Sequence, residues 1–192
     1  MKRRLPEPEP AEPAHGLEMQ ALWALEHPEE VAPRKPLQGL QRRLRLWLYP
    51  VRGTPKAWAL FMGGEDDRPL VREVAWAKQT DARHSLSPMR RLKRHPRPWP
   101  GPTIHVRDAE LFLADVQPFM DWASRAGFQT SPTARSLDGG DAQGIEGSGS
   151  LTHLRIEWKG DTPRDLEEPA YWIERLRRVL EAAVAERGRA EA

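Results

Sequence analysis

Three short segments between residues 44 and 78 have the patterns of β-strands: apolar and polar residues alternate along the first and third, and the second, 58–62, is apolar on both sides, as in a central strand. Turns rich in Gly, Pro and Asp separate the segments, so the pattern predicts three consecutive antiparallel strands. One face of the first strand would carry only leucines, Leu44, Leu46 and Leu48. The opposite face would carry Arg45, Trp47 and Tyr49. We therefore expect a sheet with one buried face and one more polar face.

The remaining predicted elements lie later in the chain. Two more alternating segments, 103–110 and 151–159, predict a fourth and a fifth strand. Apolar residues at helical spacing predict a helix with Asp115 as its N-cap and a long helix at about 166–187. The order βββ–β–α–β–α predicts an α+β fold, a two-layer sandwich with a mainly antiparallel sheet and both late helices packed on the leucine face.

Composition suggests the domain boundaries. Residues 1–40 are Pro-rich and weakly apolar, which predicts a disordered tail with one short helix at about 17–27. Residues 41–188 would form a single α+β domain, and residues 189–192 would fray at its end. Two long loops would interrupt this domain, at 79–102 and 129–150.

The composition also narrows the classes of function. The chain has 192 residues and no cysteine, which excludes disulfide bonds, thiolate metal sites and cysteine nucleophiles. No apolar segment follows the basic start, and no window of about 18 residues is apolar enough to span a membrane. We therefore expect a cytoplasmic protein with no membrane contact. Because 24 of its 30 basic residues are Arg, the composition favours a GC-rich bacterial genome.

The net charge of +2 conceals an asymmetry between the two halves of the chain. Residues 1–100 carry a net charge of +7, and residues 101–192 carry a net charge of −5. Such a split indicates either an acidic partner for the basic half or attraction between the halves within the fold. We favour the second interpretation.

The sequence contains no motif that is specific for catalysis. It has no G-x-S-x-G, no phosphate-binding loop that ends in Gly-Lys-Ser/Thr, and no His-Glu-x-x-His. His105, His153 and Glu157 place imidazole and carboxylate groups on predicted strands, but they form a site only if they converge in one cleft. We interpret them as part of a solvated sheet face. An enzyme is therefore not favoured, and we expect neither a cofactor nor a metal.

Two surfaces remain as candidates for binding. The first is the polar side of the sheet, which we call the aromatic–Arg face: Arg45, Trp47, Tyr49, Arg72 and Trp76. Exposed Trp, Tyr and Arg dominate protein interfaces, and aromatic rings can stack on single-stranded bases. Alternatively, the N-terminal helix with Trp23, or a long loop, covers this face. The exposure of Trp47 and Trp76 distinguishes the two interpretations.

The second surface is a basic loop that contains Arg90, Arg91, Lys93, Arg94 and Arg97. Such a cluster can neutralise phosphates or bind an acidic partner. Together, the two surfaces favour a non-enzymatic protein that binds another protein, as adaptors, regulators and toxin-neutralising immunity proteins do. A nucleic-acid-binding module that uses the basic loop is the alternative, and an enzyme of unknown class is a further one. Neither the identity of the partner nor the oligomeric state follows from the sequence.

Overall fold

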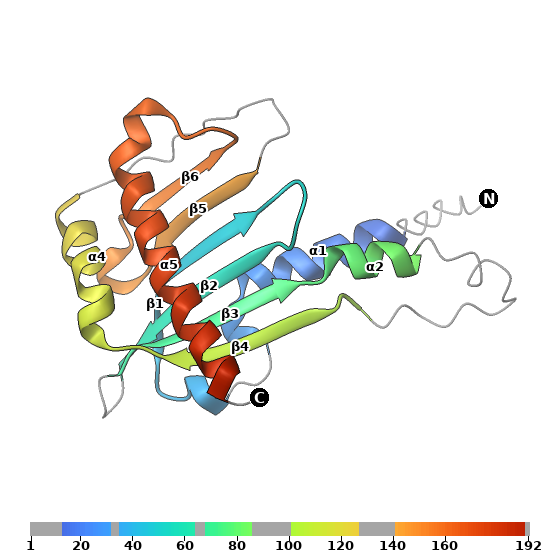
Figure 1. Ribbon diagram of the computed structural model, residues 1–192, viewed down its shortest axis with the longest axis horizontal. Helices are drawn as coiled ribbons and strands as arrows, with labels where there is room; N and C mark the ends of the chain where they lie inside the picture. Colours follow the sequence, from blue (N-terminus) through green and yellow to red (C-terminus); the bar gives the residue numbers. More distant parts are fainter. Residues whose placement is uncertain (1–12, 32–34, 64–67, 86–100, 127–140, 191–192) are drawn as a thin grey trace, which may run out of the picture.

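The fold is built on a six-stranded antiparallel sheet with the strand order β4-β3-β2-β1-β5-β6 (Figure 1). The computed structural model describes residues 13–31, 35–63, 68–85, 101–126 and 141–190. The strands are β1 Gln41–Tyr49, β2 Lys56–Met62, β3 Leu70–Trp76, β4 Ile104–Glu110, β5 Ala142–Gly147 and β6 Arg155–Lys159. The helices are α1 Pro13–Glu26, α2 Lys78–Ser85, α4 Leu113–Ala126 and α5 Glu167–Ala190. None of the described helices is long and apolar enough to cross a membrane.

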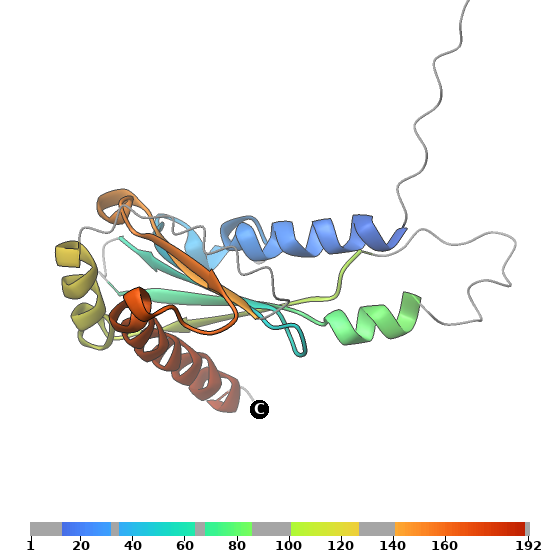
Figure 2. The same cartoon turned by 90° about the horizontal axis from the view of Figure 1, so that it is seen from above.

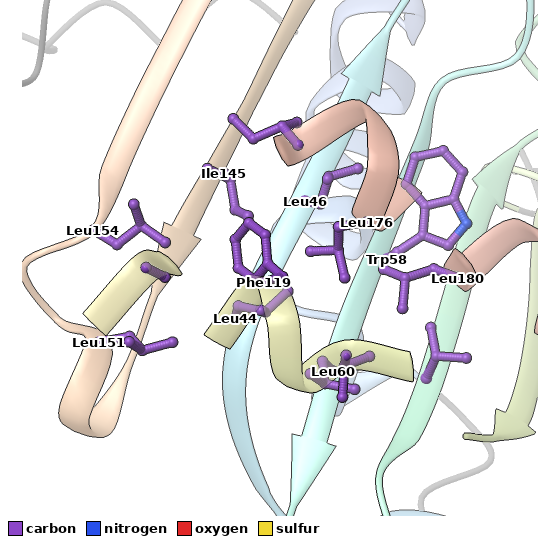
Figure 3. Packing of buried hydrophobic residues seen from close by; sticks show 14 of the residues in the cluster. Leu44, Leu46, Trp58, Leu60, Phe119, Ile145, Leu151, Leu154, Leu176 and Leu180 are labelled. Atoms are coloured by element: carbon purple, nitrogen blue, oxygen red, sulfur yellow. The ribbon is translucent and has the colours of Figure 1, made fainter. Parts of the chain in front are cut away.

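The main core lies between the sheet and the two late helices. The leucines of β1 share one apolar cluster with Trp58 and Leu60 of β2, with Phe119 of α4 and with Leu176 of α5 (Figure 3). Each helix contributes one buried stripe because its apolar residues recur at helical spacing. The predicted fold class is confirmed: the protein is an α+β sandwich whose α4 and α5 pack on the leucine face of an antiparallel sheet.

Helix α1 lies on the opposite face of the sheet from α5 (Figure 2). It corresponds to the helix predicted at about 17–27, and it begins four residues earlier, at Pro13. Its residues Ala21 and Leu25 belong to a second apolar cluster that includes Trp47 and Trp76. The two clusters are separate because successive side chains of a strand point to opposite faces of the sheet.

The structure corrects the prediction that 79–102 and 129–150 are loops. Helix α2 ends inside the first segment, and β5 lies inside the second. The two glycines of β5 interrupt the alternation of apolar and polar residues, so the sequence pattern does not indicate a strand there. Gly144 is required there, because a Cβ atom would collide with the ring of Trp47 and with the carbonyl oxygen of Ile156. This close approach of the neighbouring strands β1 and β6 explains why β5 has glycine in place of a strand-forming residue.

Two predicted element starts were also wrong. Strand β6 begins at Arg155, because residues Gly149–Leu151 before it form a 3-10 turn, η3. Helix α4 begins at Leu113, so Asp115 lies in the first helical turn and is not the N-cap. A carboxylate in that turn still interacts favourably with the positive end of the helix dipole.

Candidate functional site

The aromatic–Arg face is covered by the N-terminal part of the chain. Trp47 is 6% exposed, Trp76 is 4% exposed and Arg72 is fully buried, while α1 lies over this side of the sheet (Figure 2). The interpretation of this face as an open binding surface was therefore wrong. The alternative, in which the N-terminal helix covers it, is confirmed.

Arg72 binds the segment that follows α1 to the sheet. Its guanidinium donates to both carboxylate oxygens of Asp108, at 2.7 and 2.8 Å. It also donates to the carbonyl oxygens of Pro28, at 3.2 Å, and Val31, at 2.8 Å. These partners are required because a buried charge that loses its partner costs about 3–5 kcal/mol. The sheet thus binds the short turn η1, Pro28–Glu30, through a buried cation.

Two arginines of β1 bind the last turn of α1. Arg45 donates to the carbonyl oxygen of Leu25 at 3.3 Å, and Arg42 donates to that of Glu26 at 3.2 Å. The last carbonyls of a helix have no partner within the helix, and α1 has no basic residue in its own last turn. The guanidinium groups of the sheet therefore cap α1 and meet the negative end of its dipole.

Carboxylates balance the charge of these two arginines. Glu146 of β5 lies 3.1 Å from Arg45, and Glu29 lies 3.0 Å from Arg42. The guanidinium of Arg45 also lies over the ring of Trp47, 4.6 Å from its centroid. The charged and aromatic groups of this face thus have partners within the chain, so the face is an internal docking surface for α1.

Two buried polar atoms of this face have no hydrogen bond among the described residues. One is Nε of Arg45, which still forms an ion pair with Glu146, and the other is the hydroxyl of Tyr49. Burial raises the pKa of Tyr49 to about 12; Arg45 lowers this pKa, and Glu26 and Glu146 raise it further. The folded protein therefore favours the neutral phenol well above the pH at which an exposed tyrosine ionises.

The three residues singled out as catalytic candidates do not converge. His105 lies on β4 and Glu157 on β6, which are the two outer strands, and His153 lies just before β6. Five strand spacings of about 4.8 Å separate these edges by about 24 Å. The described residues contain no group of three side chains that could hold a metal ion.

The basic loop lies outside the described residues. Arg90, Arg91, Lys93, Arg94 and Arg97 all fall within the gap between residues 85 and 101. Their role in binding an acidic partner or a nucleic acid stays a prediction.

The C-terminal half of α5 crosses the end of β4 (Figure 1). An open cleft of about 510 Å³, which we call the β4–α5 cleft, lies there and is lined by residues 109–112, Asp115 and the α5 residues Val179, Ala182, Ala183, Glu186, Arg187 and Ala190. Six of its eleven lining side chains are small or aliphatic: Ala109, Leu111, Val179, Ala182, Ala183 and Ala190. Because α5 presents alanines here, the helix approaches the strand without filling the space between them.

Phe112 lines this cleft, and its side chain is 80% exposed. It lies between Leu111, which is 7% exposed, and Leu113, at the junction of β4 and α4. Three consecutive apolar residues cannot all face the core at a strand–helix junction, because neighbouring side chains of a strand point to opposite faces. The apolar run Leu111–Leu113 is not a specific sequence signal for this site, because the longer apolar run of β2 is buried on both faces of the sheet.

Charged groups surround the apolar lining. Glu110, Asp115 and Glu186 contribute carboxylates to the cleft. On the same face of β4, Arg107 and His105 are exposed and make no ion pair with any described residue. The lining of the cleft thus carries three carboxylates and the guanidinium of Arg187, and the exposed Arg107 and His105 lie further along β4 on the face of Ala109.

A second hollow, of about 670 Å³, lies beside β1 and β2 and includes Leu37, Phe61 and Ser148. Its charged side chains, Glu29 and Arg42, are paired with each other at 3.0 Å. Its large apolar side chains Leu37 and Phe61 are buried. The large apolar side chains of this hollow are thus covered, whereas the β4–α5 cleft exposes Phe112.

No protein-family model, curated protein or solved structure matches this chain. The geometry of the chain itself therefore has to support any assignment of function. Of the surfaces described above, the β4–α5 cleft combines a cavity with a large apolar side chain exposed to water.

Proposed function

We propose that this protein binds another protein and that the β4–α5 cleft is its binding site. One observation carries the proposal: Phe112 is 80% exposed beside an apolar cleft of about 510 Å³. Adaptors, regulators and immunity proteins are the classes of protein in which such a binding domain would act.

The energetics of Phe112 support binding at this place. Removing a Phe side chain from water contributes about 1.5–3 kcal/mol, and aromatic residues in well-packed pockets dominate protein interfaces. A small ligand that filled only the cleft would leave most of the Phe112 ring in water. A partner protein can cover the ring and insert a side chain into the cleft in the same contact.

The other exposed apolar residues give weaker support for a binding site. Other large apolar side chains that are more than one third exposed include Met19 and Trp23 on α1, Val51 in the β1–β2 turn and Tyr171 on α5. None of them lines either of the two hollows described above. Met19 and Trp23 lie one helical turn apart on α1, but neither lines either of these hollows, whereas a side chain at a cavity offers a partner both shape and contact area.

Selection from a random-peptide display library tests the proposal with the full chain as bait. We expect enriched peptides whose binding is lost in Ala182→Trp, because the indole occupies the cleft from an exposed helical position. Ala185→Trp is the matched control: Ala185 is exposed on the same helix, and it does not line the cleft. This control variant should bind the peptides as the wild type does.

Truncation of the aromatic ring gives a second measurement. Phe112→Ala should weaken binding of the enriched peptides by about tenfold or more, which corresponds to about 1.5 kcal/mol or more. Tyr171→Ala, which removes a 60% exposed aromatic side chain elsewhere on the surface, should leave binding unchanged. If no peptide is enriched, or if Ala182→Trp binds as tightly as the wild type, the proposal is wrong.

A further inference from the structure

The hydrogen bonds of β4 show which of its backbone groups are open. Leu111 donates to the Pro69 carbonyl and Ala77 donates to the Thr103 carbonyl, so odd-numbered residues of β4 are bonded to β3. In an antiparallel pair the bonding direction alternates along the strand. The even-numbered residues of β4 therefore direct their N–H and C=O groups away from β3: Ile104, Val106, Asp108 and Glu110.

The two edges of the sheet differ in charge: every open position of β6 is charged, but only Asp108 and Glu110 are charged among the four of β4. In β6 the same reasoning places Arg155, Glu157 and Lys159 at the open positions, because Leu154 and Gly160 are bonded to β5. Every open position of that short strand carries a charged side chain, a usual defence of edge strands against pairing. Strand β4 is two residues longer, and its open positions begin with the β-branched apolar residues Ile104 and Val106.

No described strand pairs with the outer side of β4, and the β4–α5 cleft lies at its C-terminal end. We infer that an extended segment of the partner protein adds to β4 as a further strand and places a large apolar side chain beside Ala109, in the cleft. This inference rests on the proposed function and names the form in which the partner binds. Strand addition would supply backbone hydrogen bonds for affinity and alternate side chains for specificity.

The charges along β4 define the side chains that the partner segment carries. Arg107 and Ala109 point to the same face of the sheet, two residues apart, because Glu73 and Val71 are their neighbours on β3. A residue opposite Arg107 therefore lies two positions from the residue that enters the cleft. Opposite charges directly across a strand pair are stabilising, so we expect Asp or Glu at that position of the partner. On the other face, the partly buried Ile104 and Val106 favour an apolar neighbour.

A second copy of this chain fits the edge less well. In an antiparallel pairing of two β4 strands, the register that overlaps them completely is centred on Arg107. It would set the two Arg107 side chains directly opposite each other, and like charges in that position are destabilising. We therefore commit to a segment of another protein that combines a large apolar residue with an acidic residue two positions away.

Backbone methylation of a peptide enriched in the display selection tests strand addition directly. Methyl groups on alternate peptide nitrogens remove every second N–H group. We expect one alternating set to abolish binding and the other to be tolerated, because only one set would face β4. Equal tolerance of both sets, or equal sensitivity to both, would overturn the inference.

Two proline variants test the same point from the side of the protein. Val106→Pro removes an N–H group that faces away from β3, so it leaves the β3–β4 bonds in place and should weaken peptide binding about tenfold. Glu157→Pro makes the matched change on β6 and should leave binding unchanged. Circular dichroism and the thermal midpoint report whether each variant is folded; if Val106→Pro is not, the methylated peptides still decide.

A charge exchange tests the register. Peptides enriched with the wild type should prefer Asp or Glu two positions from their large apolar residue, and Arg107→Glu should reverse this to Lys or Arg, with about a two- to fivefold change in affinity for each peptide. No change in preference would contradict the register.

If Ala182→Trp abolishes binding but Val106→Pro and methylation do not, strand addition is wrong and the proposed function stands. If sedimentation shows that the free protein dimerises and that Val106→Pro abolishes the dimer, the occupant of the β4 edge is a second copy and the inference is wrong.

Discussion

The aromatic–Arg face and the β4–α5 cleft are two surfaces of similar chemistry that differ in what covers them. Both combine large apolar side chains with charged groups. On the aromatic–Arg face, Arg45 and Arg72 bind carbonyls at and after the end of α1, and Trp47 and Trp76 are buried beneath that helix. At the cleft, Phe112 remains 80% exposed. Residue types that are enriched at interfaces therefore do not show whether the partner is another protein or the same chain.

The difference between the two surfaces has a physical cause. The buried guanidinium groups of the sheet need acceptors, and the terminal carbonyls of α1 need donors, so each satisfies the other when the helix docks. The cleft has no such internal complement among the described residues. Its alanines on α5 leave a volume of about 510 Å³ that no described side chain fills.

The largest expected effect on stability is that of replacing Arg72, the buried cation that binds the N-terminal segment to the sheet. Arg72→Met removes the bonds to Asp108 and to two carbonyls, so we expect the free energy of unfolding to fall by about 3 kcal/mol. Urea unfolding measures this change. Arg68→Met is the control, because the ion pair of Arg68 with Glu110 is exposed and should contribute less than about 1 kcal/mol. Equal losses in the two variants would mean that Arg72 does not anchor the segment.

An effect of intermediate size comes from Tyr49 at alkaline pH. The folded protein holds the pKa of Tyr49 at about 12, above the ordinary value of 10.0, so the stability that the neutral phenol contributes is complete below pH 10 and is lost as the pH rises towards 12. Tyr49→Phe cannot ionise and should gain about 2 kcal/mol over the wild type near pH 12.

The same substitution also gives a comparison at neutral pH. The Tyr49 hydroxyl has no partner among the described residues, so Tyr49→Phe should unfold at an equal or higher urea concentration than the wild type. A difference between the two proteins that stays constant from pH 8 to pH 12 would show that α1 does not bury this hydroxyl.

The smallest expected effect on stability belongs to the open surface. Phe112→Ala should change the free energy of unfolding by less than about 0.5 kcal/mol, because a side chain that is 80% exposed contributes little to the fold. The same variant should lose peptide binding, which would separate the role of Phe112 in binding from any role in folding. A loss of stability as large as that of Arg72→Met would place Phe112 in the core and remove it from the site.

The sequence predicted the parts of the fold that follow from local periodicity. Alternation located β1, β3 and β4, a short apolar segment between two turns located β2, and helical spacing located α5. Strand β5 was missed because Gly144 makes room for Trp47 on the neighbouring strand, which is a contact between residues about 100 positions apart. The separation of His105 and His153 depends on the strand order, which periodicity does not determine.

The candidate site was less accessible to sequence reasoning. Whether Trp47 is buried depends on α1 docking through bonds such as that from Arg45 to the Leu25 carbonyl, and no local pattern encodes that bond. The cleft depends on the crossing of α5 over the end of β4 (Figure 1). The run of three apolar residues at 111–113 did not distinguish this site, because the longer apolar run of β2 is buried on both faces of the sheet.

The contrast between a covered face and an open cleft can be measured directly by hydroxyl-radical footprinting of the free protein with mass spectrometry. Pairs of identical residue types remove differences in intrinsic reactivity. We predict that Trp47 and Trp76 are oxidised much more slowly than Trp23, which is 50% exposed, and that Phe112 is oxidised much faster than Phe61, which is 2% exposed. Oxidation of Trp47 and Trp76 at the rate of Trp23 would contradict the account, because the aromatic–Arg face would then be open.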